Sequence, residues 1–124
     1  MKKEFVLYID EIQPTKPCLD SEKIQKFKNE NSEQKLECSV SVKIINEEIT
    51  LIRGHEEVYA MMLEGMKKVS VCWEENLGDV KYYEYCIRSC QKNNIKTIHD
   101  LKSRIFDHYN YEKELETLKK GYLD

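Results

Sequence analysis

The sequence predicts an α+β fold, with a small mixed β-sheet, helices packed on it and further helices towards the C-terminus. The first observation behind this prediction is the order of local patterns: strand, helix, hairpin, helix, strand and then three helices. The second is size, because 124 residues with 40% hydrophobic side chains suffice for one core and leave no room for a second domain of normal size. We therefore predict a single domain spanning residues 1–124.

The first element is predicted to be a strand. The run from Phe5 to Ile9 is β-branched and aromatic, and it stops at Asp10. Pro14 and Pro17 keep the following segment out of regular helix and sheet interiors. We therefore expect an irregular connection after the first strand.

A helix is predicted to follow this connection. Asp20 can serve as its N-cap, while Leu19 packs on Ile24 as a hydrophobic staple. The helix should end near residues 29–31, where asparagines gather. The polar stretch 29–37 has no periodicity, so we interpret it as a loop within the domain.

A β-hairpin and a second helix are predicted in the middle of the chain. Alternating apolar residues over 40–44 and a second extended run over 49–52 flank Asn46-Glu47, the pattern of two strands joined by a tight turn. After Gly54 the spacing becomes helical and ends around Gly65. The residues expected on the buried side of this helix are Val58, Tyr59, Met61 and Met62.

A further strand and a third helix come next. The alternation over 69–73 predicts the strand. Asp79 can cap the helix, and Asn93-Asn94 should end it. Its apolar stripe consists of Tyr83, Cys86, Ile87 and Cys90. We interpret Cys86 and Cys90 as core residues, because no second cysteine pair has the spacing of a zinc site.

Two more helices are predicted at the C-terminus. Thr97 and Asp100 approximate a capping box, which predicts a short helix with its apolar residues at Ile98, Leu101 and Ile105. The last helix is expected to run from Asn110 and to stop near Gly121. Its apolar residues are Tyr111, Leu115, Leu118 and Tyr122. We interpret His99 and His108 as surface or capping residues.

Charge and composition indicate a cytoplasmic protein without a membrane partner. The chain has 20 basic and 23 acidic residues, hence a net charge of −3. No apolar run approaches the roughly 18 residues of a membrane helix, and five apolar residues after Glu4 are too few for a signal peptide. The cysteines, odd in number and without a C-x-x-C motif, are expected to be free thiols: Cys18, Cys38, Cys72, Cys86 and Cys90.

The densest functional signal is the segment from Leu51 to Ala60, in which a strand turns through Gly54 into a helix. The first amides of a helix and the positive end of its dipole suit a phosphate, so the turn could bind an anion. In the other interpretation Gly54 merely makes the turn, and Glu56 and Glu57 are acids that the dipole favours in a first turn. Local chemistry leaves both interpretations open.

Several motifs, in order, resemble one known family. They are Ile12-x-Pro14, Leu19-Asp-Ser-Glu-Lys-Ile24, the hairpin, Ile52-Arg-Gly-His-Glu-Glu-Val-Tyr-Ala60, Leu63-Glu-Gly-Met-Lys-Lys-Val-Ser-Val71, Trp73-Glu-Glu, Tyr85-Cys-Ile-Arg-Ser-Cys90 and Ile95-Lys-Thr-Ile-His-Asp-Leu101. This order is similar to that of the ParB/sulfiredoxin-like superfamily, and especially of small bacterial ParB-like nuclease-domain proteins. The resemblance implies a ParB N-terminal/sulfiredoxin-like core over residues 4–75 and a C-terminal helical extension over 79–122.

The resemblance also shows where this chain departs from the family. In ParB-type relatives the turn reads G-H-H-R or G-E-R-R, and its arginines hold nucleotide phosphates. Here Glu56 and Glu57 stand where the second histidine and the arginine would stand, and Arg53 precedes the glycine. Sulfiredoxins carry a nucleophilic cysteine next to the glycine, where this chain has His55, so sulfiredoxin chemistry is excluded. The residues that the resemblance assigns to an anion or nucleotide site are Arg53, Gly54, His55, Glu56, Glu57 and Lys16.

Two new acids weaken the case for a bound phosphate. A carboxylate about 4 Å from one phosphate charge costs about 4 kcal/mol at an effective dielectric constant of about 20. Arg53 and Lys16 could offset part of this cost. We therefore predict a degenerate phosphate turn in a non-catalytic binding or interaction module, with no catalytic residue, no metal and no cofactor.

Two alternatives remain open. One is a nucleotide-dependent enzyme or switch, such as a nuclease, NTPase or small-molecule kinase, which would bind a nucleotide with Mg²⁺ through Arg53, Gly54 and His55. The other is a DNA-associated accessory factor that contacts the nucleic acid with a basic stretch. That stretch comprises Arg88, Lys92, Lys96, Lys102 and Arg104. Eight tyrosines exceed what a small core needs, so we also expect a protein partner that binds a tyrosine-lined surface.

Overall fold

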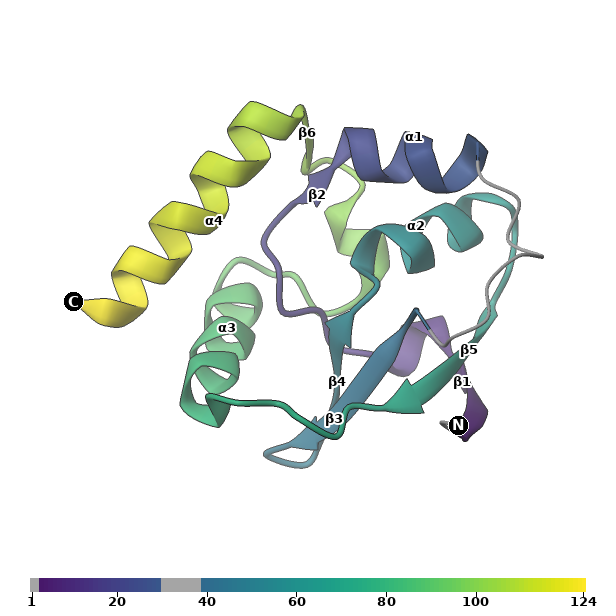
Figure 1. Ribbon diagram of the computed structural model, residues 1–124, viewed down its shortest axis with the longest axis horizontal. Coiled ribbons are helices and arrows are strands. Elements are labelled where there is room, and N and C mark those ends of the chain that lie inside the picture. Colours follow the sequence, from purple (N-terminus) through teal and green to yellow (C-terminus); the bar gives the residue numbers. More distant parts are fainter. Residues whose placement is uncertain (1–2, 30–38) are drawn as a thin grey trace.

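The computed structural model describes residues 3–29 and 39–124, and it confirms the α+β class (Figure 1). The strands are β1 (Glu4–Tyr8), β2 (Leu19–Asp20), β3 (Ser41–Ile45), β4 (Glu48–Arg53), β5 (Lys68–Trp73) and β6 (Ile105–Phe106). The helices are α1 (Ser21–Asn29), α2 (His55–Leu63), α3 (Val80–Lys92) and α4 (His108–Leu123), with 3₁₀ turns η1 (Ile9–Glu11) and η3 (Ile98–Leu101). Most of the loop predicted over 29–37 lies outside the described residues.

The main sheet is mixed, as predicted. Its strand order is β1-β5-β3-β4, with β1 antiparallel to β5, β5 parallel to β3, and β3 antiparallel to β4. In Figure 1, α1 and α2 lie side by side over this sheet, whereas α4 stands apart from it beside the short strands β2 and β6. These two short strands pair in parallel, and they join the beginning of the chain to its last third.

The hairpin between β3 and β4 is confirmed, and its turn falls on the predicted residues. Asn46 and Glu47 both have positive φ angles, of 50° and 68°. A two-residue hairpin loop favours this left-handed pair because its twist matches that of the flanking strands. The alternation of apolar residues on both sides then places Val42 and Leu51 opposite each other in the core.

Local capping signals locate three of the turns that begin helices. The backbone N–H of Glu22 donates to Asp20 Oδ1 at 3.0 Å, and the N–H of Tyr82 donates to Asp79 Oδ1 at 3.2 Å. The capping box of Thr97 and Asp100 is also present. These predictions were confirmed because each cap is a contact between residues two or three positions apart.

The helix predicted through Ile105 is wrong. The structure has a single 3₁₀ turn that ends at Leu101, and Ile105 then lies in β6, opposite Leu19. The backbone N–H of Leu19 donates to the carbonyl of Arg104 at 2.9 Å, so β2 provides an extended partner that competes with the helical hydrogen bonds. The apolar spacing from Leu101 to Ile105 is compatible with both conformations.

The last helix begins two residues earlier than predicted, at His108, and continues through Gly121 to Leu123. Gly121 therefore does not end the helix. A Cβ atom at this position would collide with the hydroxyl of Tyr85 on α3, so the glycine permits α3 and α4 to approach closely here. None of the described helices has the length and apolar character needed to cross a bilayer.

One hydrophobic cluster unites the sheet with the helical C-terminal part. Leu51 and Val58, from β4 and α2, share it with Cys90, Ile95 and Leu101. Cys86 and Cys90 are both buried, which confirms that they belong to the interior. The residues over 79–122 therefore contribute to the same core as the strands.

Candidate functional site

The turn at Gly54 leads from β4 into α2 and requires glycine for two reasons. Its φ angle is 99°, in the left-handed region that side chains disfavour. A Cβ atom would also lie 2.8 Å from the carbonyl oxygen of Ser39 and 2.9 Å from Cγ2 of Val40. The glycine therefore sets the direction of α2, and the side chains that follow it determine what the helix N-terminus contacts.

His55, the first residue of α2, is directed into the protein. Its side chain is only 1% exposed, and Nε2 accepts a hydrogen bond from the backbone N–H of Thr15 at 3.0 Å. Burial, together with the nearby ammonium groups of Lys16 and Lys23, lowers the pKa of His55 well below 6.5. His55 is therefore a neutral acceptor that ties the segment between β1 and β2 to the start of α2.

Glu56 takes the place of an external anion at the helix N-terminus. Only 3% of it is exposed, and its Oε2 accepts from Lys16 Nζ and from the backbone N–H of Asp20, both at 3.0 Å. Its Oε1 lies 3.1 Å from the same ammonium. An ammonium, a backbone amide and a helix N-terminus are the donors that a phosphate would use. Here the ammonium of Lys16 and the backbone amide of Asp20 are bound by a carboxylate of the chain itself.

Helix α4 covers this ion pair. Lys16 Nζ donates to Tyr111 Oη at 2.5 Å and lies 4.8 Å from the centre of the Tyr111 ring, with Lys23 Nζ at 5.4 Å. Tyr111 is buried, and that burial, followed by the charge of Glu56, raises the pKa of its hydroxyl. Tyr111 therefore covers the ammonium of Lys16, and this ammonium in turn binds Glu56 in the first turn of α2.

A second polar contact holds the start of α4. His108 Nδ1 donates to Asp20 Oδ2 at 2.7 Å, while the other oxygen of Asp20 caps α1. This hydrogen bond raises the pKa of His108 above 6.5. Burial opposes the charged form of Asp20, but the hydrogen bonds from His108 and from the N–H of Glu22 outweigh it and lower the pKa of Asp20 below 3.8.

Asp20, Glu22 and His108 are also the described residues best placed for a metal ion, because their ligand atoms all lie within 4.8 Å of one another. One nitrogen and two carboxylate oxygens could hold a divalent cation. In the structure, however, Asp20 and His108 satisfy each other directly. His55 and Glu56 are likewise occupied by Thr15 and Lys16, so the turn itself offers no ligand set.

The structure separates Arg53 from the other predicted site residues. Its Nε donates to Glu74 Oε1 at 3.0 Å and to Ser41 Oγ at 3.3 Å, and its side chain is 52% exposed. Glu57 is half-buried and makes no hydrogen bond or ion pair with the residues that the structure describes. Gly54, His55, Glu56 and Lys16 are thus brought together, whereas Arg53 is directed towards Glu74.

The five basic residues between 88 and 104 do not share one environment. Arg88 and Lys92 are exposed on α3, and Lys102 is exposed after η3. Lys96 lines a surface hollow together with Asp10, Glu11 and Glu48, three acidic residues. Arg104 is directed inwards, where its Nε donates to the carbonyl of Pro17.

Sequence reasoning missed Thr15, Asp20, His108 and Tyr111 as members of the site. Asp20 was recognised only as a helix cap, and His108 only as a surface or capping residue. Asp20 and His108 are separated by 88 positions, and Lys16 and Tyr111 by 95. The β2–β6 pairing brings them together, and no local pattern in the sequence indicates that pairing.

The chain matches no protein-family model and no curated protein. Its structure is similar to the crystal structure of protein Atu1540 from Agrobacterium tumefaciens, with a TM-score of 0.51 and 20% sequence identity. The similarity covers 82% of this chain and 62% of that protein, so the chain spans less than two thirds of its length. At this identity the similarity concerns the fold alone.

Proposed function

We propose that this chain is a non-catalytic binding module of the ParB/sulfiredoxin-like type, in which the phosphate turn is filled by a side chain of the protein. The observation that carries the proposal is the position of Glu56, whose carboxylate accepts from Lys16 and from the backbone of Asp20. To bind there, a phosphate would have to displace this carboxylate and tolerate its charge nearby. It would also have to displace Tyr111, which covers the pair.

The surrounding groups are poorly suited to catalysis. The Nε2 lone pair of His55 is engaged by Thr15, so the histidine is not free to act as a general base. Cys18 lies close to Lys16 in the chain, but burial raises the pKa of its thiol to about 12. At neutral pH it is therefore protonated and a weak nucleophile.

The binding part of the proposal is supported by the edge of the main sheet. Among the strands that the structure describes, β1 pairs with β5 alone, and its residues Val6 and Tyr8 are largely exposed. Exposed apolar side chains on an edge strand are a surface on which a protein partner can add a strand. The rings of Tyr82 and Tyr85 on α3, in contrast, both contact the ring of Tyr122 on α4.

The direct test is a titration with CTP, ATP and ADP, with and without Mg²⁺, followed through the backbone amide signals of residues 55–58. We expect no shift in the wild-type protein and no hydrolysis. Glu56→Ala should respond to inorganic phosphate at these amides, because it frees Lys16 and the N–H of Asp20. Glu57→Ala is the matched control, since it removes an acid that has no described partner. Micromolar binding at these amides with turnover would contradict the proposal.

A further inference from the structure

We propose that the C-terminal half of α3 carries a separate site for a nucleotide unit, with the phosphate on Arg88 and Lys92 and the base against Tyr85. The site is a hollow of about 540 Å³ lined by Tyr85, Arg88, Ser89, Lys92 and Asn93. It shares no residue with the turn at Gly54. The inference is therefore independent of the function proposed above.

Unneutralised positive charge is the first support for this site. Arg88 and Lys92 stand one helical turn apart, and neither side chain forms an ion pair or hydrogen bond with any residue that the structure describes. Like charges at this spacing repel each other, so an anion between them would relieve the repulsion. Two other cations differ in this respect, because Lys16 is paired with Glu56 and Arg53 with Glu74.

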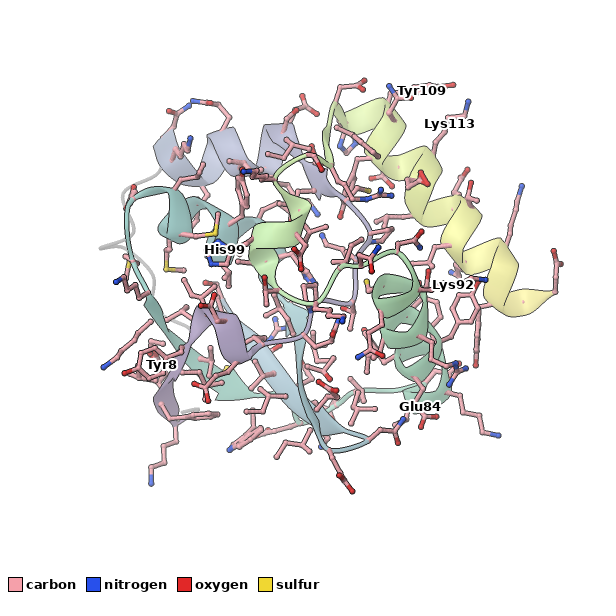
Figure 2. All side chains as sticks on the ribbon, turned by 180° about the vertical axis from the view of Figure 1, so that it is seen from behind. Tyr8, Glu84, Lys92, His99, Tyr109 and Lys113 are labelled. Carbon is pink, nitrogen blue, oxygen red and sulfur yellow. The ribbon has the colours of Figure 1, made fainter. Side chains whose placement is uncertain are left out.

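The absence of acids from the lining is the second support. Two other hollows of the described structure contain carboxylates, Asp107 and Glu114 in one and Asp10, Glu11 and Glu48 in the other. The nearest acid on α3 itself is Glu84, which precedes Arg88 by one turn. Figure 2 shows Lys92 at the C-terminal end of α3 and Glu84 in its first half, and no ion pair joins Glu84 to any described residue.

The remaining lining residues fit the rest of a nucleotide. Tyr85 is half-buried, its ring lies against Tyr122 with the centroids 5.5 Å apart, and its hydroxyl lies close to Gly121. A fixed aromatic ring beside the aliphatic stems of two cations is a surface on which a base can stack. Ser89 offers a hydroxyl, while the Asn93 amide donates to the carbonyl of Ser89 and fixes the end of the helix.

The test is a titration of the full chain with CMP, followed by backbone amide shifts. We expect saturable shifts confined to residues 85–93, with residues 55–58 unchanged. Ribose 5-phosphate should bind several times more weakly, because it lacks the base. A titration with a single-stranded thymidylate oligomer shows whether the site binds a nucleotide within a strand or a free nucleotide. If the oligomer binds with higher affinity per phosphate than CMP, the ligand is a nucleotide within a strand. CMP that binds equally well or better would indicate the free nucleotide.

The variant Arg88→Ala/Lys92→Ala should weaken the binding of CMP by at least about tenfold. Each hydrogen bond from a charged side chain to the phosphate contributes about this factor or more to the affinity. Lys96→Ala/Lys102→Ala is the matched control, since it removes the same charge from exposed positions outside the hollow. Both variants change only exposed side chains, so they should remain folded. Shifts located elsewhere, or equal weakening by both double variants, would overturn the proposal, as would the absence of any shift at millimolar CMP.

Discussion

The ammonium of Lys16 lies 3.0 Å from the carboxylate of Glu56, forty positions further along the chain, beneath the ring of Tyr111. This ion pair joins the connection between β1 and β2 to the N-terminus of α2. It supplies the negative charge that a helix N-terminus favours, without any ligand. The stability of the fold and the state of the candidate site therefore depend on the same two side chains.

Removal of one partner of this ion pair should destabilise the folded protein. Lys16→Met leaves the buried carboxylate of Glu56 without its ammonium, and we expect a loss of about 3 kcal/mol in the free energy of unfolding, measured by urea denaturation. Lys16→Met/Glu56→Leu should regain more than half of this loss, since no buried charge is then left unpaired.

Arg53→Ala provides the comparison with an exposed pair. Arg53 contacts Glu74 from a half-exposed position, so its loss should cost no more than about 1 kcal/mol. The same variant tests the enzyme alternative, because a nucleotide site that uses Arg53 would lose its affinity. If Lys16→Met and Arg53→Ala lower the free energy of unfolding by equal amounts, the assignment of Glu56 as a buried acceptor is contradicted.

Protonation of His55 should destabilise the protein on mild acidification. Its pKa is lowered well below 6.5 in the folded state, so the unfolded chain binds the extra proton more readily. The free energy of unfolding should fall as the pH drops below 6.5, by up to about 1.4 kcal/mol per pH unit. Denaturation curves for His55→Gln should lack this slope, whereas His99→Gln should retain it.

His108 should have the opposite pH dependence. Its pKa is raised by Asp20, so the stabilisation is complete below 6.5 and is lost as the pH rises through the higher pKa of the folded state. A proton NMR titration of the imidazole should give a midpoint above 6.5 in the wild type and a lower one in Asp20→Asn. Hydrogen exchange in the first turns of α4 should accelerate over the same pH range. A midpoint unchanged by the substitution would show that the contact with Asp20 does not persist in solution.

The two glycines with similar backbone angles should respond differently to substitution. Gly54 and Gly65 have φ angles of 99° and 93°, but only at Gly54 would a Cβ atom meet other atoms within 4 Å. Gly65→Ala should lower the free energy of unfolding by about 1 kcal/mol through backbone strain. Gly54→Ala should lower it by more, because the added Cβ atom would also collide with the backbone carbonyl of Ser39. Thermal unfolding of the two variants provides the measurement.

Local signals allowed most elements of the fold to be predicted. The caps at Asp20 and Asp79 and the hairpin turn at Asn46-Glu47 are decided by residues a few positions apart. The parallel pairing of Leu19 with Ile105 could not be predicted, because two-residue strands carry no periodicity and their partners are distant in sequence.

The candidate site could be predicted only in part, for the same reason. The glycine and the acids of the turn are visible in the sequence, which also shows that positions 56 and 57 carry no cation. The contact of Glu56 with Lys16 depends on how the connection before β2 folds over α2. The contact of Tyr111 with Lys16 depends on where α4 docks. Neither arrangement is visible in a local pattern of the sequence. Met61 and Met62, expected on the buried side of α2, are partly buried and pack against the core, while His55 and Glu56 at the start of the helix are fully buried.

The pairing of β2 with β6 has a consequence for synthesis on the ribosome. Leu19 and Asp20 are made early, yet the strand that completes their hydrogen bonds is Ile105–Phe106, and Ile9 shares its cluster with Leu101. The contacts of this N-terminal segment with residues 101–106 can therefore form only after those residues have left the exit tunnel. Translation that pauses before residue 101 would leave the hydrogen bonds of β2 incomplete and increase the chance of misfolding.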